Sequence, residues 1–155
     1  MRRLAFTLVS VIISALVIAG IPVLTFGTNT SFTLQPLEEH TITLSLQQAD
    51  GVSGSFSTVS DDGTGINFHV TDPYNNTILH YDGVLQRSFS FTAEVDGDFQ
   101  LHFNNTLSAG SRKTVSLNYD VTHYIMGLPQ EQFLMIVVVA VAVIGLMLYA
   151  VLMPK

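Results

Sequence analysis

The sequence of 155 residues contains no cysteine. This absence excludes disulfide bonds, cysteine-based metal sites and a cysteine nucleophile. Basic residues are also scarce, with 6 lysines and arginines against 12 aspartates and glutamates. All the acidic residues lie within residues 38–131, where Arg87, Arg112 and Lys113 are the basic ones, so this segment has a formal charge of 3 − 12 = −9. An acidic surface argues against nucleic acid as a partner.

Recognisable catalytic motifs are absent as well. The sequence has no Gly-x-Ser-x-Gly nucleophile elbow, no phosphate-binding loop and no zinc-protease motif. Serine, histidine and aspartate occur, but no spacing places them together. The sequence therefore predicts a protein that is not an enzyme and that has no cofactor.

Charged residues are missing from two long apolar runs, Leu4–Phe26 and Phe133–Met153. Each is longer than the roughly 20 residues that a helix needs to span a bilayer. Arg2, Arg3 and Lys155 flank these runs, and basic flanks mark the cytoplasmic side. We therefore expect both ends of the chain inside and the acidic middle outside the membrane.

The first apolar run fits either a cleaved signal peptide or a retained signal-anchor. Its basic start and the small residue Ala19 before Gly20 fit a cleavage site. The run continues to Phe26, however, beyond the about 7–15 apolar residues of a usual signal peptide. Its length favours the anchor.

Alternation of apolar and polar residues dominates the middle of the chain. In Ser88–Tyr124, three runs that begin at Phe89, Phe99 and Val115 each place apolar side chains on one face. They are joined by Glu94–Asp98, which contains Gly97, and by Asn104–Arg112, which is rich in Asn, Ser and Gly. These turn residues predict an antiparallel meander. Shorter runs precede it at Phe32–Leu34, Thr41–Gln47, Val52–Val59, Ile66–Val70 and Thr77–Tyr81. About eight strands with turn signals every 8–12 residues are typical of an antiparallel β-sandwich.

The predicted fold class is thus all-β, a sandwich flanked by an N-terminal and a C-terminal transmembrane helix. The expected parts are a signal-anchor or signal peptide (1–27), an extracytoplasmic sandwich (28–124), a connector (125–132), a transmembrane helix (133–153) and a cytoplasmic tail (154–155).

Five motifs follow one another in order along residues 32–105. They are Phe-x-Leu-x-Pro at Phe32–Pro36, Val-x-Gly-x-Phe at Val52–Phe56, an apolar strand ending in Asp-Pro at Ile66–Pro73, Phe-x-Phe-x-Ala at Phe89–Ala93 and GDFQLHFNN at Gly97–Asn105. This ordered set resembles the GOLD (Golgi dynamics) domain in the luminal part of the transmembrane cargo receptors of coated transport vesicles. The resemblance implies a β-sandwich and a role in protein interaction.

Some features of that family are missing. Its members usually have a disulfide, whereas His102 stands where the second cysteine would be and no cysteine lies near Glu39–Thr41, where the first would fall. The connector 125–132 is too short for the receptors' coiled-coil stem, and Pro154-Lys155 lacks their coat-binding signals. The resemblance therefore implies the domain and an interaction role, and not recruitment of vesicle coats.

Three of the five histidines, His40, His69 and His102, are candidate metal ligands. Neighbouring strands could bring the outward-facing His69 and His102 together, and the resemblance implies that His40 and His102 are close in space. No short His-x-His or His-x₃-His spacing is present, so surface histidines are the favoured interpretation.

Turn formation likewise explains the loop carboxylates better than calcium binding does. These are Asp61, Asp62, Asp72, Asp96 and Asp98.

Asn29, Asn75 and Asn104 begin Asn-x-Ser/Thr sequons and are candidate glycosylation sites.

The sequence as a whole predicts a membrane-anchored extracytoplasmic module that binds another protein, as an accessory subunit or adaptor of a membrane complex. Two alternatives stay open. One is a cargo-receptor-like protein of membrane trafficking, and the other is an envelope protein that binds metal through histidines.

Overall fold

A computed structural model describes residues 27–106 and 110–152 of the chain. The apolar run 4–26, predicted to be a signal-anchor or signal peptide, and the predicted cytoplasmic tail lie outside these described residues.

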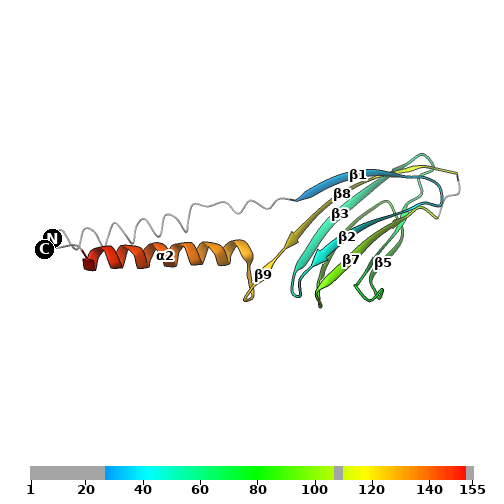
Figure 1. Ribbon diagram of the computed structural model, residues 1–155. Helices are drawn as coiled ribbons and strands as arrows, with labels where there is room; N and C mark the ends of the chain where they lie inside the picture. The colour runs from blue at the N-terminus through cyan, green and yellow to red at the C-terminus, as the bar shows by residue number, and fades with distance from the viewer. Residues whose placement is uncertain (1–26, 107–109, 153–155) are drawn as a thin grey trace. The chain divides into compact units, whose positions relative to one another are not determined.

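Eight strands form two four-stranded antiparallel sheets, in agreement with the predicted sandwich (Figure 1). The strands are β1 (Thr28–Leu34), β2 (Glu39–Leu46), β3 (Gly51–Ser60), β4 (Ile66–Thr71), β5 (Thr77–Val84), β6 (Gln86–Thr92), β7 (Gly97–Asn104) and β8 (Lys113–Thr122). Sheet A has the order β1-β8-β3-β6, and sheet B has the order β2-β7-β4-β5. Each strand overlaps one of the predicted runs. Where the run alternates, one face of the strand is buried between the sheets.

The meander predicted for Ser88–Tyr124 is wrong. Its three strands do not pair with one another, since β6 and β8 lie in sheet A, each beside β3, while β7 lies in sheet B between β2 and β4. The chain crosses from one sheet to the other at each of these connections. Alternation identifies a buried face, but both sheets bury the same kind of face, so the pattern does not select the partner strand.

Phenylalanine side chains from both sheets fill the space between them. The ring of Phe56 in sheet A lies 5.0 Å from that of Phe68 in sheet B, and Phe56 meets Phe103 edge-on at 5.5 Å. Phe89 of sheet A also contacts Phe68, at 4.9 Å. Edge-on and tilted pairs of this kind are the favoured aromatic arrangements. Leucine, isoleucine and valine complete the core, with Leu34, Ile66, Val70, Leu101, Val115 and Leu117 among its most buried members.

The end of the chain forms a second unit with its own structure. A two-stranded hairpin, β9 (Tyr124–Ile125) and β10 (Leu128–Pro129), occupies most of the predicted connector. Its turn residues Met126 and Gly127 both have positive φ, as a tight two-residue hairpin requires. Helix α2 (Gln130–Leu152) follows directly. Its segment Gln130–Tyr149 is long and apolar enough to cross a membrane, and no part of this segment is buried within the described structure.

Candidate functional site

A row of histidines crosses the outer face of sheet B. In the strand register, His80 of β5 lies opposite His69 of β4, and His69 lies opposite His102 of β7. On its other side His102 faces Thr41 of β2. The three side chains point away from the core because they alternate with buried residues such as Phe68, Val70 and Leu101. We call His69, His80 and His102 the histidine row.

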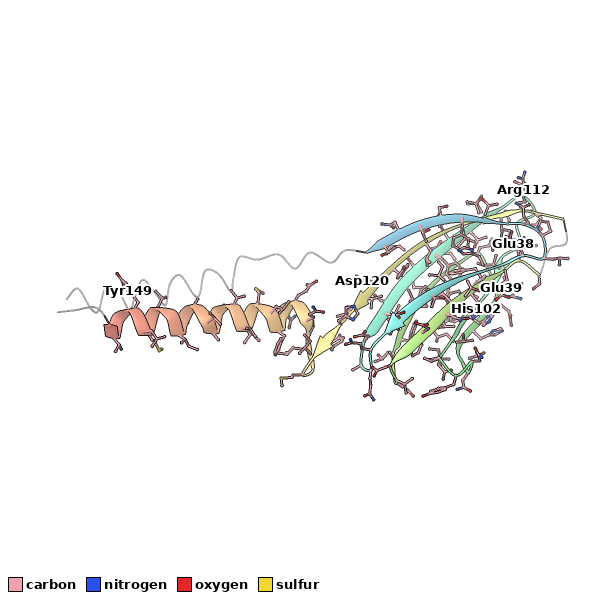
Figure 2. The ribbon with its side chains drawn as sticks, in the orientation of Figure 1. Glu38, Glu39, His102, Arg112, Asp120 and Tyr149 are labelled. Atoms are coloured by element: carbon pink, nitrogen blue, oxygen red, sulfur yellow. The ribbon has the colours of Figure 1, made fainter. Side chains whose placement is uncertain are left out.

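Glu39 reaches this row from the start of β2 (Figure 2). Its Oε1 accepts a hydrogen bond of 2.6 Å from Nδ1 of the half-buried His102, and its Oε2 accepts one of 3.1 Å from Asn104 Nδ2. A carboxylate can only accept, so Nδ1 of His102 carries the proton. Nε2 of His102 is then the acceptor for the hydroxyl of Thr71, at 3.1 Å. Contacts on both sides therefore hold the His102 ring.

His69 completes a three-residue cluster with Glu39 and His102. The rings of His69 and His102 are stacked, with their centroids 4.3 Å apart and their planes 1° from parallel. One potential ligand atom from each of the three residues lies within 4.8 Å of the other two. Two imidazoles and a carboxylate form a donor set that zinc and other first-row transition metals accept.

The environment of the cluster favours its metal-binding protonation states. Partial burial lowers the pKa of His69, and the neighbouring His102 lowers it further, so the neutral imidazole is favoured. Partial burial pushes the pKa of Glu39 upward, but hydrogen bonds from His102 and Asn104 outweigh it and hold this pKa below its usual value. Near neutral pH the cluster therefore offers a carboxylate and a neutral His69.

The third predicted ligand, His40, lies apart from this cluster. Its position on β2 is paired with Phe103, next to His102, but its ring packs on Phe32 with centroids 4.2 Å apart. Because successive side chains of a strand point to opposite faces, His40 and Glu39 diverge. The remaining histidines have carboxylate partners of their own. His80 pairs with Asp82 at 2.9 Å, and His123 pairs with the buried Asp50 at 2.7 Å.

Four of the five loop carboxylates considered for calcium accept hydrogen bonds from the protein itself. Asp72 accepts hydrogen bonds from the backbone of Tyr74 and Asn76. Asp62 accepts one from the backbone of Thr64. Two more, Asp96 and Asp98, accept hydrogen bonds from the backbone of Gln48 and the hydroxyl of Ser45, respectively.

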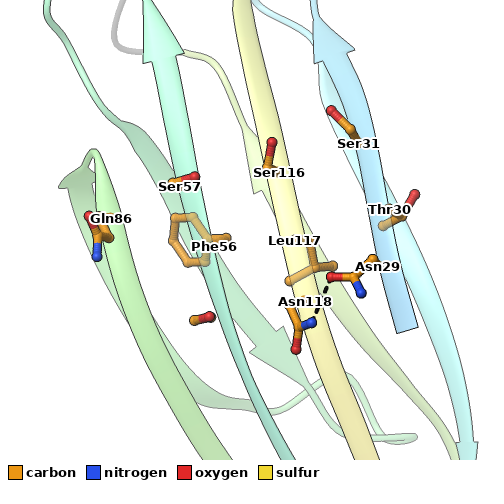
Figure 3. A pocket seen from close by; sticks show the side chains of 10 residues that line it. Asn29, Thr30, Ser31, Phe56, Ser57, Gln86, Ser116, Leu117 and Asn118 are labelled. Carbon is orange, nitrogen blue, oxygen red and sulfur yellow. Dashed lines mark hydrogen bonds between the residues drawn. The ribbon is translucent and has the colours of Figure 1, made fainter. Parts of the chain in front are cut away.

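The three sequon asparagines differ in accessibility. Asn75 is exposed in the β4–β5 turn with a φ of 64°. Asn104 is half-buried, and the side-chain nitrogen that would carry a glycan donates to Glu39. Asn29 is exposed on β1, where its Oδ1 accepts a hydrogen bond of 2.6 Å from Asn118 (Figure 3). Asn75 is thus the best-presented acceptor of the three.

The outer face of sheet A contrasts with the histidine row because most of its side chains are short, polar and uncharged, and the exceptions, Val59 and Asp120, lie at its two ends. We call this surface the neutral face. It consists of Asn29, Ser31, Thr33, Ser53, Ser55, Ser57, Gln86, Ser88, Ser90, Thr114, Ser116 and Asn118. A shallow groove of about 620 Å³ lies on it, with Phe56 and Leu117 beneath the polar side chains (Figure 3).

Comparison with known proteins places this architecture in a family. Residues 29–147, which include the sandwich and most of α2, match the family described as emp24/gp25L/p24 family/GOLD. The chain belongs to this family. GOLD domains are luminal domains of membrane proteins, and membership indicates a protein-interaction module of the cargo-receptor kind. The predicted resemblance is therefore confirmed.

The other comparisons are more distant. No curated protein matches the chain. Among solved structures, PliG, a periplasmic inhibitor of g-type lysozyme from Aeromonas hydrophila, is 13% identical and aligns over 65% of this chain and 90% of its own, with a TM-score of 0.48. The Yersinia pseudotuberculosis-derived mitogen is 10% identical over 68% of this chain and 99% of its own, also with a TM-score of 0.48.

Sequence reasoning about this GOLD domain missed one member of the cluster, Glu39. It identified His69 and His102 because both alternate with apolar residues on predicted strands. The available signal for Glu39 was its place in Glu39–Thr41, the segment where the resemblance implies the family's first cysteine, with the second at His102. In the strand register Thr41 faces His102, and Glu39 reaches His102 through a hydrogen bond.

Proposed function

We propose that this GOLD-family protein is a membrane-anchored extracytoplasmic module that acts as an accessory subunit or adaptor of a membrane complex. The observation that carries the proposal is α2, which follows a complete GOLD sandwich and exposes apolar side chains along its length. Ile136, Val141 and Ile144 are each more than half exposed. Such a surface is unfavourable in water and favourable in lipid or against another transmembrane helix.

The charge distribution points to the neutral face as the surface that a partner covers. Covering a charged group requires its desolvation, which is costly unless a partner charge compensates it. The outer face of sheet B carries Glu39, Asp98 and the histidine row, whereas the neutral face carries hydroxyl and amide groups only. The matching partner is the extracytoplasmic part of another membrane protein with an uncharged polar surface, which can exchange hydrogen bonds with these groups.

A pull-down tests this proposal. The full-length chain is purified from native membranes in mild detergent, and the eluate is analysed by mass spectrometry. We expect one stoichiometric membrane-protein partner with the wild type. We expect its loss with Ser116→Arg, which places a charge at the centre of the neutral face between Ser31 and Ser57.

The matched control is Thr43→Arg, an exposed residue on the outer face of sheet B, which should retain the partner. Recovery of the chain alone would overturn the accessory-subunit proposal. Equal loss of the partner with both variants, or with neither, would overturn the assignment of the neutral face.

Family membership also favours a cargo-receptor-like function as a second candidate. Against it, only residues 123–129 separate β8 from α2, which is too few for a coiled-coil stem between sandwich and membrane helix. The same pull-down separates the two functions. A cargo receptor should recover several secreted proteins in substoichiometric amounts, whereas an adaptor should recover one partner at a constant ratio.

A further inference from the structure

We propose that Glu39, His69 and His102 form a binding site for a divalent first-row transition-metal cation, for which Zn²⁺ is the natural probe. The site goes beyond the proposed interaction function, since neither the neutral face nor α2 contributes to it. Its ligands come from three neighbouring strands, β2, β4 and β7, on the outer face of sheet B.

The strand register positions the ligands. His69 and His102 are directly opposite each other on β4 and β7, which brings outward side chains of adjacent antiparallel strands into contact. Glu39 on β2 is opposite Asn104, which is the next outward-facing residue after His102 on β7. Glu39 is therefore a diagonal neighbour of His102. β7 and β4 are the two inner strands of the sheet, and the backbone of β7 is hydrogen-bonded to β4 on one side and to the edge strand β2 on the other. The site is therefore built on strands and not on loops.

The distances allow coordination after small side-chain rotations. Zinc bonds of about 2.0–2.2 Å place tetrahedral ligand atoms about 3.3–3.5 Å apart, and the three ligand atoms here already lie within 4.8 Å of one another. Coordination requires the stacked rings of His69 and His102 to leave their parallel arrangement. A metal ion bound between His102 and Glu39 takes the place of the Nδ1 proton. The neutral ring then carries its proton on Nε2, which donates to the hydroxyl of Thr71.

Surrounding groups support the ligands. Asn104 donates to the second oxygen of Glu39, and Thr71 contacts the other nitrogen of His102. Such outer contacts fix ligand orientation in metal sites. Three protein ligands leave at least one coordination position open for water or for a group of another molecule.

Calorimetric titration of Zn²⁺ alone into the metal-free full-length protein in mild detergent tests the site. We expect one Zn²⁺ per chain and a higher unfolding temperature with Zn²⁺ present, since a cation that binds the folded state stabilises it. His69→Gln is the primary variant, because His102 has structural hydrogen bonds that its replacement also removes. We expect His69→Gln to weaken binding at least about tenfold while the metal-free protein unfolds at an unchanged temperature.

His40→Gln is the matched control, because this exposed histidine lies outside the cluster, and it should bind Zn²⁺ like the wild type. Glu39→Gln provides a second ligand variant with the same expected loss. The proposal is overturned if the wild type binds no stoichiometric Zn²⁺, or if His69→Gln and Glu39→Gln both bind it with wild-type affinity. Neither outcome depends on whether a partner protein is recovered in the pull-down.

Discussion

At the residue scale, Gly54 lies at a closely packed position of the core, where the effect of adding one methyl group can be predicted. Its position on β3 faces the interior, and the Phe89 ring occupies the space that a side chain would need. An added Cβ would lie 2.6 Å from Phe89 Cζ and 2.8 Å from the carbonyl oxygen of Asn118. We predict that Gly54→Ala lowers the free energy of unfolding by about 1–3 kcal/mol, as overpacking does.

Thermal unfolding of the full-length protein, followed by the circular dichroism of the sheets, measures this change. Ser55→Ala is the matched control because Ser55 is the next residue of β3 and is exposed. It should change stability by no more than about 0.5 kcal/mol. Equal stability of Gly54→Ala and Ser55→Ala would contradict the packing argument.

Lys113 is a second informative residue, because its side chain is fully buried at the start of β8. Its Nζ donates to the carbonyl oxygen of Gly65. Burial lowers the pKa of Lys113, and the negative charge of Asp62 opposes this effect. The unfolded chain therefore binds more protons than the folded protein between the lowered pKa and the ordinary lysine value of about 10.4.

Stability should consequently rise with pH across that window, because the cost of burying the ammonium group disappears as it loses its proton. We predict that Lys113→Met, which removes the titrating group, makes the pH dependence shallower over the same range. Unfolding temperatures of both proteins from neutral pH to about pH 10 provide the measurement. Parallel curves would show that Lys113 does not titrate differently in the folded and unfolded states.

At the scale of elements, the turn between β4 and β5 depends on Asp72. Its Oδ1 accepts hydrogen bonds from the backbone of Tyr74 and Asn76, and its Oδ2 accepts one from the Asn76 side chain. The hydrogen bond from the Asn76 side chain is the largest cause of the lowered Asp72 pKa. Desolvation opposes it, and the backbone donors of Asn76 and Tyr74 lower the pKa further. A lowered carboxylate pKa contributes stability that is present above the unfolded value of about 3.9 and is lost as the pH falls through the folded value.

We therefore predict that the wild type loses stability below about pH 4 more steeply than Asp72→Asn, whose side chain does not titrate there. Unfolding temperatures measured at a series of acidic pH values test this. Because Asn76 supplies the largest contribution to the shift, Asn76→Ala should also reduce the steepness. Adding Asn76→Ala to Asp72→Asn should not reduce the steepness further. If the two changes reduced it additively, Asn76 would not act through Asp72.

Sequence patterns predicted the strands of this fold better than their pairing. Each alternating run became a strand, because a buried face leaves a period-two signature in any sheet. The pairing of β8 with β1 and β3 depends on contacts between residues far apart in the sequence, such as Asn29 and Asn118, which are 89 positions apart. No local pattern encodes which of two similar inner faces a strand will join, and this is why the meander prediction failed.

The candidate metal site was likewise predictable in its individual residues but not in the pairing that brings them together. His69 and His102 were both predictable as outward residues, but their contact depends on β4 and β7 being neighbours. Glu39 was not recognised as a ligand because charged residues at the start of an exposed strand are common. Its role depends on the register of β2 against β7, in which Glu39 faces Asn104 and thereby reaches His102.

At the scale of the whole molecule, the charge pattern divides the chain into parts suited to different surroundings. The sandwich carries eleven of the twelve acidic residues, from Glu38 to Asp120, whereas Gln130–Tyr149 of α2 contains Glu131 as its charged residue. The acidic sandwich is suited to water and the apolar helix to lipid. Basic residues at the chain ends favour an orientation with the sandwich outside the cytoplasm.

The complete absence of cysteine makes this orientation directly measurable. We predict that Asp61→Cys, at an exposed turn of the sandwich, reacts with a membrane-impermeant maleimide in intact cells that express the full-length chain. Lys155→Cys should react only after permeabilisation, because we place this end in the cytoplasm. The wild type should not react at all, so every signal reports the introduced thiol. The reverse pattern would place the sandwich in the cytoplasm and exclude the proposed extracytoplasmic partner.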